Sequence, residues 1–301
     1  MTSVKFFPPK QRLVANLKLV KVVSNLSQEE FDGMTVNSGK RGILEVCNHK
    51  KFGTVRTVYR IANDQHEGES VEAFTELDRA IMSVCDSNWD AGNHHISSAI
   101  ILRGLSGKNN RENGYGKIYP EQRDAILASL KKLMTTLLEI DLSDTNEKLK
   151  YHEGQRQILS AAILPCEIKS TVINGQVVED AIHLLDDSIF MKLARERKQI
   201  LTFDTALLDA SDIKNTPMNI ILKNYVMCRV TEIKLHRNLK PILTFEDIFR
   251  KARITDASRD TKMNARNVVE KFFEHLKANN LIKSFELTKK GNAFYSVKFV
   301  Y

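Results

Sequence analysis

The spacing of hydrophobic residues changes near residue 70, from a pattern typical of strands to one typical of helices. Runs rich in β-branched and apolar residues at 17–23 and 43–61, separated by glycine-containing turns, are typical of strands. From Phe74 onward apolar residues recur every three to four positions, which is the period of an amphipathic helix. The polar segment 64–70 separates the two patterns. We therefore expect a β-rich N-terminal segment over residues 1–72.

The pattern after this break predicts three helices followed by a hairpin. Asn174-Gly175 is the dipeptide best suited to the positive-φ turn that joins two antiparallel strands. Pro120 stands where a helix favours proline, at its first turn. The helices are expected at 74–85, 96–105 and 120–138, and the hairpin strands at 158–173 and 176–185. Three helices and a two-stranded ribbon, in this order, indicate a winged helix.

The same order then repeats. A short helix (187–197) and an extended stretch (199–203) lead to a helix that begins at Pro217. Thr244 with Asp247 three residues on fits a capping pattern and predicts a helix to Arg253. A third helix is expected at 261–278 and a closing hairpin at 281–301. We therefore predict an α+β chain with two tandem winged-helix domains, residues 73–198 and 199–301.

Composition agrees with a globular chain of two domains. The chain has 301 residues, of which 42% are apolar and 27% charged, which excludes disordered and collagenous classes. It lacks an apolar run of membrane-spanning length and a signal-peptide core, so we expect no membrane association and a cytoplasmic location. The four cysteines are far apart and lack zinc-ligand spacing, which predicts reduced, mostly buried thiols.

The positive charge is concentrated in the last third of the chain. The formal net charge is +8, and residues 199–301 hold 18 Lys and Arg against 11 Asp and Glu, whereas the preceding residues are nearly balanced. A concentrated basic surface attracts polyanions, and nucleic acid is the commonest one inside cells. A generally solvated basic surface is the alternative interpretation.

The third helix of the second domain carries the residue types that read DNA. Arginine pairs with guanine, asparagine pairs with adenine, and basic side chains neutralise phosphates. We expect the N-terminal half of this helix to enter a major groove, the end of the preceding helix to hold phosphate, and the hairpin tip to reach the flanking backbone or minor groove. The candidates are Arg259, Lys262, Asn264, Arg266, Asn267 and Lys271 on the third helix, Arg250, Lys251 and Arg253 before it, and Lys289 and Lys290 at the tip.

The first domain is a weaker candidate for DNA reading. Its third helix mixes Arg123 with acidic residues such as Glu121 and Asp124, and its hairpin is largely apolar. Such a ribbon favours a protein contact, including self-association to a homodimer by edge pairing. A larger hydrophobic core explains it equally well.

Sequence signals for catalysis are weak. Residues 104–109 resemble a phosphate loop, but Asn109 stands where a magnesium-binding hydroxyl is required. His94 and His95 are consecutive, so their side chains diverge instead of converging on a metal. Asp186-Asp187 fits a helix start, where the helix dipole favours negative charge. We therefore expect no enzymatic activity, no cofactor and no metal site.

Particular residues of the chain, together with the element order, resemble a known family. Residues 197–203, then Leu207-Leu208-Asp209, then 219–230 with Tyr225 and Arg229, are similar to the strand and long first helix that open the second domain of iteron-binding replication initiators. These proteins, of theta-replicating plasmids and mobile elements, contain two tandem winged helices. The resemblance covers roughly residues 73–301.

The resemblance implies a division of labour between the domains. The second domain would read direct repeats in double-stranded DNA at an origin, while the first would contact DNA loosely and mediate dimerisation. Origin melting would follow from DNA bending and recruitment of a host helicase or other replication proteins. Two alternatives stay open: a winged-helix transcriptional regulator of a mobile element, and a protein-binding adaptor.

Overall fold

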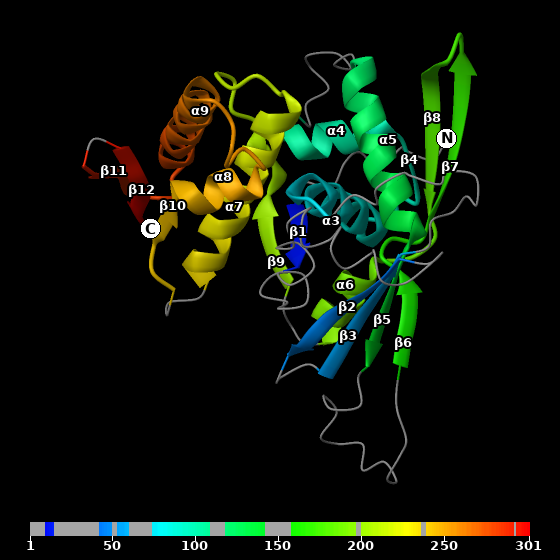
Figure 1. Ribbon diagram of the computed structural model, residues 1–301. Coiled ribbons are helices and arrows are strands. Elements are labelled where there is room, and N and C mark those ends of the chain that lie inside the picture. The colour runs from blue at the N-terminus through cyan, green and yellow to red at the C-terminus, as the bar shows by residue number, and fades with distance from the viewer. Residues whose placement is uncertain are drawn as a thin grey trace.

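The computed structural model describes residues 10–14, 42–49, 53–59, 74–108, 118–141, 158–196, 200–235, 239–291 and 293–301 (Figure 1). Its mixture of helices and strands confirms the predicted α+β class. The strand expected at 17–23 lies outside these residues. None of the helices within them combines the length and apolar character needed to cross a bilayer.

The first half of the chain packs its helices against a small sheet. Asn174 and Gly175 have φ of 51° and 77°, so this dipeptide forms the expected positive-φ hairpin turn. The sheet has the strand order β4-β8-β7. Its elements are α3 (Glu76–Asp90), β4 (His95–Ile96), α4 (Ser98–Ser106), α5 (Pro120–Thr135), β7 (Cys166–Ile173), β8 (Gln176–Leu184) and α6 (Ile189–Glu196).

A second sheet corrects the expectation of one long strand at 158–173. Strand β6 (Ile158–Ala162) does not continue the hairpin but pairs with β5 (Thr136–Asp141). Pro165 has no N–H for a ladder hydrogen bond, and Ile163 and Leu164 next to it are buried in the core. With β2 (Gly42–His49) and β3 (Gly53–Tyr59), these strands form an antiparallel sheet in the order β2-β3-β5-β6.

The second half repeats the topology of the first. Thr244 caps α8 by accepting a hydrogen bond from the backbone N–H of Asp247 at 3.1 Å, as the capping pattern predicts. The helix ends at Lys251, two residues earlier than expected, because Arg253 takes a left-handed φ of 54°. The elements are β9 (Ile200–Asp204), η3 (Thr205–Leu208), α7 (Pro217–Leu235), β10 (Ile242–Thr244), α8 (Phe245–Lys251), α9 (Arg259–Ala278), β11 (Ser284–Lys290) and β12 (Ala293–Val300).

Two hydrophobic cores accompany the two halves. The first gathers buried residues between Phe74 and Ala194 together with Ile220, and the second gathers residues from Leu201 to Phe299. Their sheets have corresponding strand orders, β4-β8-β7 and β10-β12-β11, in which the short first strand pairs with the last. Helices α3 and α7 pack against each other across the seam between the cores. The domain limits at residues 198 and 199 stay a prediction.

Polar contacts also cross this seam. Asn224 on α7 donates its side-chain amide to the backbone carbonyl of Leu105 on α4 at 3.0 Å. Gly107, with φ of 77°, ends α4 directly against the backbone of Leu208 and Asp209. The seam therefore depends on close backbone approach as well as on apolar packing.

Helix α3 connects most of these elements through its four carboxylates. It is buried along most of its length, and a buried carboxylate requires partners. Each of the four binds a different part of the chain. Glu76 contacts Lys251 of α8, Asp78 contacts Ser129 and Lys132 of α5, Asp86 contacts Ser188 before α6, and Asp90 pairs with Arg12 of β1 (Lys10–Val14) and Arg195 of α6.

Asp86 is one of the two most buried of these carboxylates, together with Asp78. It accepts hydrogen bonds from the backbone N–H of Ser188 at 2.8 Å and from its hydroxyl at 2.7 Å. Burial nevertheless raises the pKa of Asp86 from 3.8 to about 7, with the hydrogen bonds from Ser188 and the charge of Arg195 opposing the shift and Asp187 adding to it. Asp86 is thus protonated over much of the acidic range in the folded protein.

Gly107→Ala is expected to destabilise the protein by about 3 kcal/mol, from left-handed strain plus overpacking. A Cβ at position 107 would lie 2.4 Å from the backbone nitrogen of Asp209. Gly175→Ala is the matched control: φ is also 77° but nothing lies within 4 Å of the added carbon, so the cost should be about 1 kcal/mol. Urea unfolding measures both, and equal losses would contradict the close approach.

Asp86→Asn is expected to change how stability depends on pH. The folded-state pKa is raised, so the stabilising contribution of Asp86 is fully present below pH 3.8 and is lost as pH rises to about 7. The neutral amide keeps polar partners for Ser188 and does not titrate. The variant should therefore gain about 4 kcal/mol relative to the natural protein between pH 4 and pH 8. Urea unfolding across this range measures the difference.

Substitution of an exposed carboxylate provides the control for this pH series. Asp256→Asn changes the same chemical group at a solvent-exposed position. Because the position is exposed, its stability should stay within about 0.5 kcal/mol of the natural protein. A profile for Asp86→Asn that also follows the natural protein would contradict the raised pKa.

Candidate nucleic-acid interface

Helix α9 separates a buried stripe from a polar outer face, as its periodicity predicts. Ser258 caps the helix by accepting from the N–H of Thr261 at 3.2 Å. The inward stripe packs into the second core, with Val268 half-buried at its margin. Its buried members are Ala265, Val269, Phe272, Phe273 and Leu276. The opposite face is therefore open to a ligand.

The outer face brings together several of the predicted DNA-reading residues. Arg259, Asn264, Asn267 and Lys271 are exposed, and Lys262 is half-buried. Successive residues at spacings of three and four lie on one side of a helix, which aligns Asn264, Asn267 and Lys271. Met263, which the sequence argument did not select, is 48% exposed on this helix.

Acidic residues share this helix. Asp260 and Glu274 are exposed, and Glu270 is half-buried. The basic and amide groups thus have acidic neighbours at both ends of the face, and the charge on α9 alone is mixed. The net positive charge of the second half must come mainly from the segments around α9.

Arg266 has a different place from the one expected. Its guanidinium lies over the rings of Phe245 and Phe249 of α8, at 5.7 Å and 5.5 Å from the ring centroids. This geometry is a cation–π contact that joins α9 to α8. Arg266 is half-buried, so the expectation that it projects freely toward a base is corrected: packing on two aromatic rings directs it toward α8.

The structure also corrects the role expected for Lys251. Its ammonium lies 3.1 Å from a carboxylate oxygen of Glu76, and both side chains are largely buried. Burial lowers the pKa of Lys251, while the charge of Glu76 opposes this shift. Lys251 is turned into the seam between the cores and is not placed to hold phosphate.

Its neighbours Arg250 and Arg253 are both exposed, as expected for phosphate contacts. Arg250 forms an ion pair with Asp247 on the same helix. Burial alone would raise the pKa of Asp247, but hydrogen bonds from Thr244 and Arg250 outweigh it and lower the pKa. A ligand phosphate would have to compete with this carboxylate for Arg250.

The hairpin β11–β12 supplies the expected tip beside α9. Its turn contains Gly291 with φ of 63°, and Lys289 is exposed. The backbone of Lys290 lies in β11, whereas its side chain is outside the described residues. Tyr295, 47% exposed, and Lys298, also exposed, add an aromatic and a basic side chain on β12.

Two basic residues of α5 in the first half form structural contacts instead. Arg123 on α5 lies 3.2 Å from Asp180, which in turn accepts from Ser98 at the start of α4. Lys132 lies 2.6 Å from the buried Asp78. The tip of the β7–β8 hairpin exposes apolar side chains, namely Val172, Ile173 and Val178.

Residues that were considered for catalysis or metal binding have separate surroundings. His94 stacks on Trp89, and His95 stacks on His183, so the two imidazoles do diverge. No group of three His, Cys, Asp or Glu in the described ranges is arranged to hold a metal ion. Three of the four cysteines, Cys85, Cys166 and Cys228, are buried thiols, in agreement with the sequence.

No protein-family model matches the chain, and no curated protein sequence matches it. Among solved structures, RctB domains 2-3 give a TM-score of 0.46 at 12% identity, covering 87% of this chain and 92% of that one. Selenomethionine derivatives of domains 2 and 3 of RctB give 0.45 at 12% identity, covering 87% and 91%. A likeness at this level does not define what the chain does.

Arg266→Ala is expected to lower the free energy of unfolding by about 1 kcal/mol, because a partly desolvated cation–π contact is lost. Arg259→Ala removes the same group from an exposed position on the same helix and should leave stability within about 0.5 kcal/mol. Urea unfolding of both variants measures the two changes in stability. Equal stabilities would show that the ring contact is not formed in solution.

Proposed function

We propose that this chain is a sequence-specific double-stranded DNA-binding protein and that its second half provides the main contact. It acts by binding and not by catalysis, without a cofactor. The outer face of α9 lies along the major groove, and the β11–β12 tip contacts the flanking backbone. Arg250, Arg253 and Arg259 contact phosphates at the two ends of this surface.

The observation that carries this proposal is the element order around α9. Helix α7, strand β10, helices α8 and α9 and the hairpin β11–β12 follow one another as in a winged helix, with the sheet order β10-β12-β11. The first half has the corresponding order from α3 to β8. We accordingly assign two tandem winged helices to the chain.

The chemistry of the outer face supports DNA over a protein ligand. Asn264 and Asn267 are exposed amides at helical spacing, which suits hydrogen bonding to base edges. The surrounding excess of Lys and Arg in residues 199–301 supplies the phosphate attraction that the mixed charge of α9 lacks. Acidic side chains such as Asp260 and Glu274 would disfavour wrong registers on the duplex.

The biological role that we propose follows the resemblance seen in the sequence. The chain initiates replication of a plasmid or mobile element by binding direct repeats at an origin. The exposed apolar tip of β7–β8 supports a protein contact of the first half, with a second copy or a host replication protein such as a helicase. Regulation of transcription by the same DNA surface is the competing role.

Footprinting on the DNA that flanks its own gene tests the proposal. Protection of direct repeats is expected, and protection of an inverted repeat by a stable dimer would favour a transcriptional regulator. The logarithm of the binding constant should fall linearly with the logarithm of salt concentration, because phosphate contacts release counterions. Absence of salt-dependent DNA binding would favour the protein-binding adaptor.

Asn264→Ala and Asn267→Ala are each expected to weaken binding to the protected site by about 1–3 kcal/mol, while leaving binding to unrelated DNA nearly unchanged. Fluorescence anisotropy with both duplexes measures this. Lys277→Ala, an exposed basic residue in the last turn of the same helix, is the control and should affect neither duplex strongly. Equal losses of affinity for both duplexes would show that these asparagines do not contact base edges.

A further inference from the structure

Strand β1 lies on the connection between the two cores (Figure 1). It pairs antiparallel with β9 along its whole length, from residue 10 opposite 204 to residue 14 opposite 200. Strand β9 belongs to both halves, because Ile200 packs against the first core whereas Leu201 and Phe203 are buried in the second. A strand from the start of the chain therefore reinforces the segment at which one half ends and the other begins.

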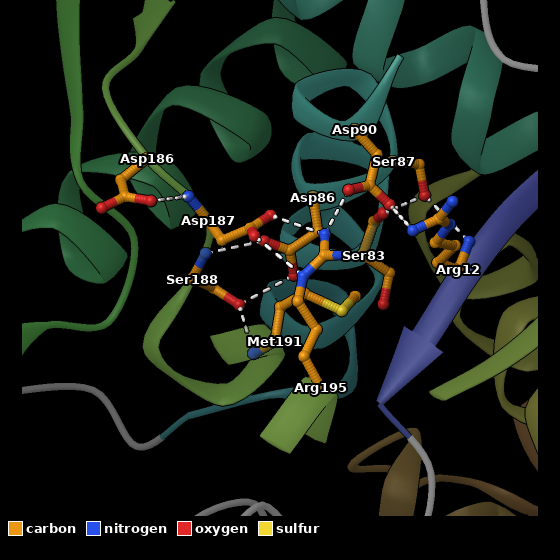
Figure 2. A network of polar contacts seen from close by, with 10 residues as sticks. All are labelled: Arg12, Ser83, Asp86, Ser87, Asp90, Asp186, Asp187, Ser188, Met191 and Arg195. Carbon is orange, nitrogen blue, oxygen red and sulfur yellow. Dashed lines mark hydrogen bonds and ion pairs between the residues drawn. The ribbon is translucent and has the colours of Figure 1, made fainter. Parts of the chain in front are cut away.

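Arg12 fixes this strand to helix α3. Its backbone N–H donates to the hydroxyl of Ser87 at 2.9 Å, and Ser87 donates in turn to the carbonyl of Ser83 at 2.7 Å. The guanidinium of Arg12 forms an ion pair with Asp90, as Figure 2 shows. The carboxylate of Asp90 is only 14% exposed, so its contact with Arg12 is shielded from solvent on the α3 side.

Asp90 joins β1 to helix α6 as well. Arg195 of α6 also contacts Asp90 and reaches Asp187 at 3.0 Å through Nε (Figure 2). Asp90 is the last residue of α3, where the helix dipole disfavours a negative charge. The carboxylate therefore requires its two arginines, and one of them comes from β1.

We propose that β1 is a clasp: through pairing with β9 and through the Arg12–Asp90–Arg195 contact, it fixes the two halves relative to each other. It thereby sets where the first half lies on a duplex that α9 and the β11–β12 tip bind. Arg12 is a positioning residue and does not itself contact DNA. The part of this inference that concerns the duplex rests on the proposed function, whereas the clasp itself does not.

The clasp adds to contacts that already cross the seam. Glu76 with Lys251, and Asn224 with the carbonyl of Leu105, are polar contacts between the halves. These polar contacts accompany the packing of α3 against α7, and buried ion pairs define geometry more than they add stability. Five residues of backbone pairing between β1 and β9 restrict rotation at the strand where the first core gives way to the second.

Hydrogen exchange of the full chain tests the clasp without DNA. In Arg12→Ala the backbone amides of β9 should exchange about tenfold faster, since a charge-assisted contact is lost. Lys10→Ala, an exposed residue two positions away on the same strand, is the matched control and should stay within about twofold of the natural protein. Amides of α9 should be unchanged in both, which excludes global unfolding. Unchanged β9 exchange in Arg12→Ala overturns the proposal.

DNA binding by the same variants tests the positioning role. Arg12→Ala should lose about tenfold in affinity for a duplex long enough to reach both halves. Its affinity for a short duplex that only α9 and the β11–β12 tip can cover should not change. Equal losses on both duplexes would make Arg12 a DNA contact and overturn the positioning role. If the natural protein binds neither duplex, the proposed function fails while the exchange result still decides the clasp.

Two further variants keep the test decisive if Arg12→Ala does not fold. Asp90→Asn keeps the size of the side chain but removes the charge that both arginines bind, so β9 amides should again exchange faster. Arg12→Lys retains the positive charge and should recover most of the protection of β9. Fast β9 exchange in Arg12→Lys equal to that in Asp90→Asn would contradict the role of the charge.

Discussion

The fold depends on satisfying the carboxylates of one buried helix. Helix α3 carries four acidic residues, and burial without partners would cost several kcal/mol for each ionised group. Their partners lie on α5, on α8, on β1, on α6 and directly before α6, so these elements are all held against the same helix. Apolar packing supplies most of the stability, but these contacts select one arrangement of the surrounding elements. For Asp86 the partners are not sufficient: its hydrogen bonds do not fully offset the cost of burying the charge, and its pKa rises to about 7.

The elements that could be predicted from the sequence are those specified by local chemistry. The Asn174-Gly175 turn, the Thr244 cap and the buried stripe of α9 each follow from a few neighbouring residues. The expected strand at 158–173 was wrong because only its second part, β7, forms the local hairpin with β8, whereas its first part, β6, pairs with β5 in another sheet, which no local pattern reveals. The repeated order of helices and strands was also predictable from local sequence, because helices and strands each show their own spacing of apolar residues.

The candidate interface was only partly predictable. Exposure of Asn264, Asn267 and Lys271 follows from the period of α9, because the apolar stripe fixes the opposite face. Lys251 and Arg266 have the residue type expected at a DNA surface, yet a buried carboxylate from α3 holds one and two aromatic rings hold the other. Residue type gives charge, but only the tertiary neighbours decide whether that charge faces solvent. Phe245 and Phe249 are four positions apart and so lie on one side of α8, but this spacing alone does not identify Arg266 as the residue that packs on their rings.

The pairing of β1 with β9 has a consequence for how the chain folds during synthesis. Strand β1 must wait for a partner that leaves the ribosome only after the first core, so its contact is among the most non-local between the described residues. Strands β2 and β3 have a shorter delay before β5 and β6 emerge. The second core, by contrast, consists of residues from one continuous stretch and can condense as soon as it is complete. Strand β1 can therefore take its place only after the first half has been made, whereas most of the second core is synthesised after β9.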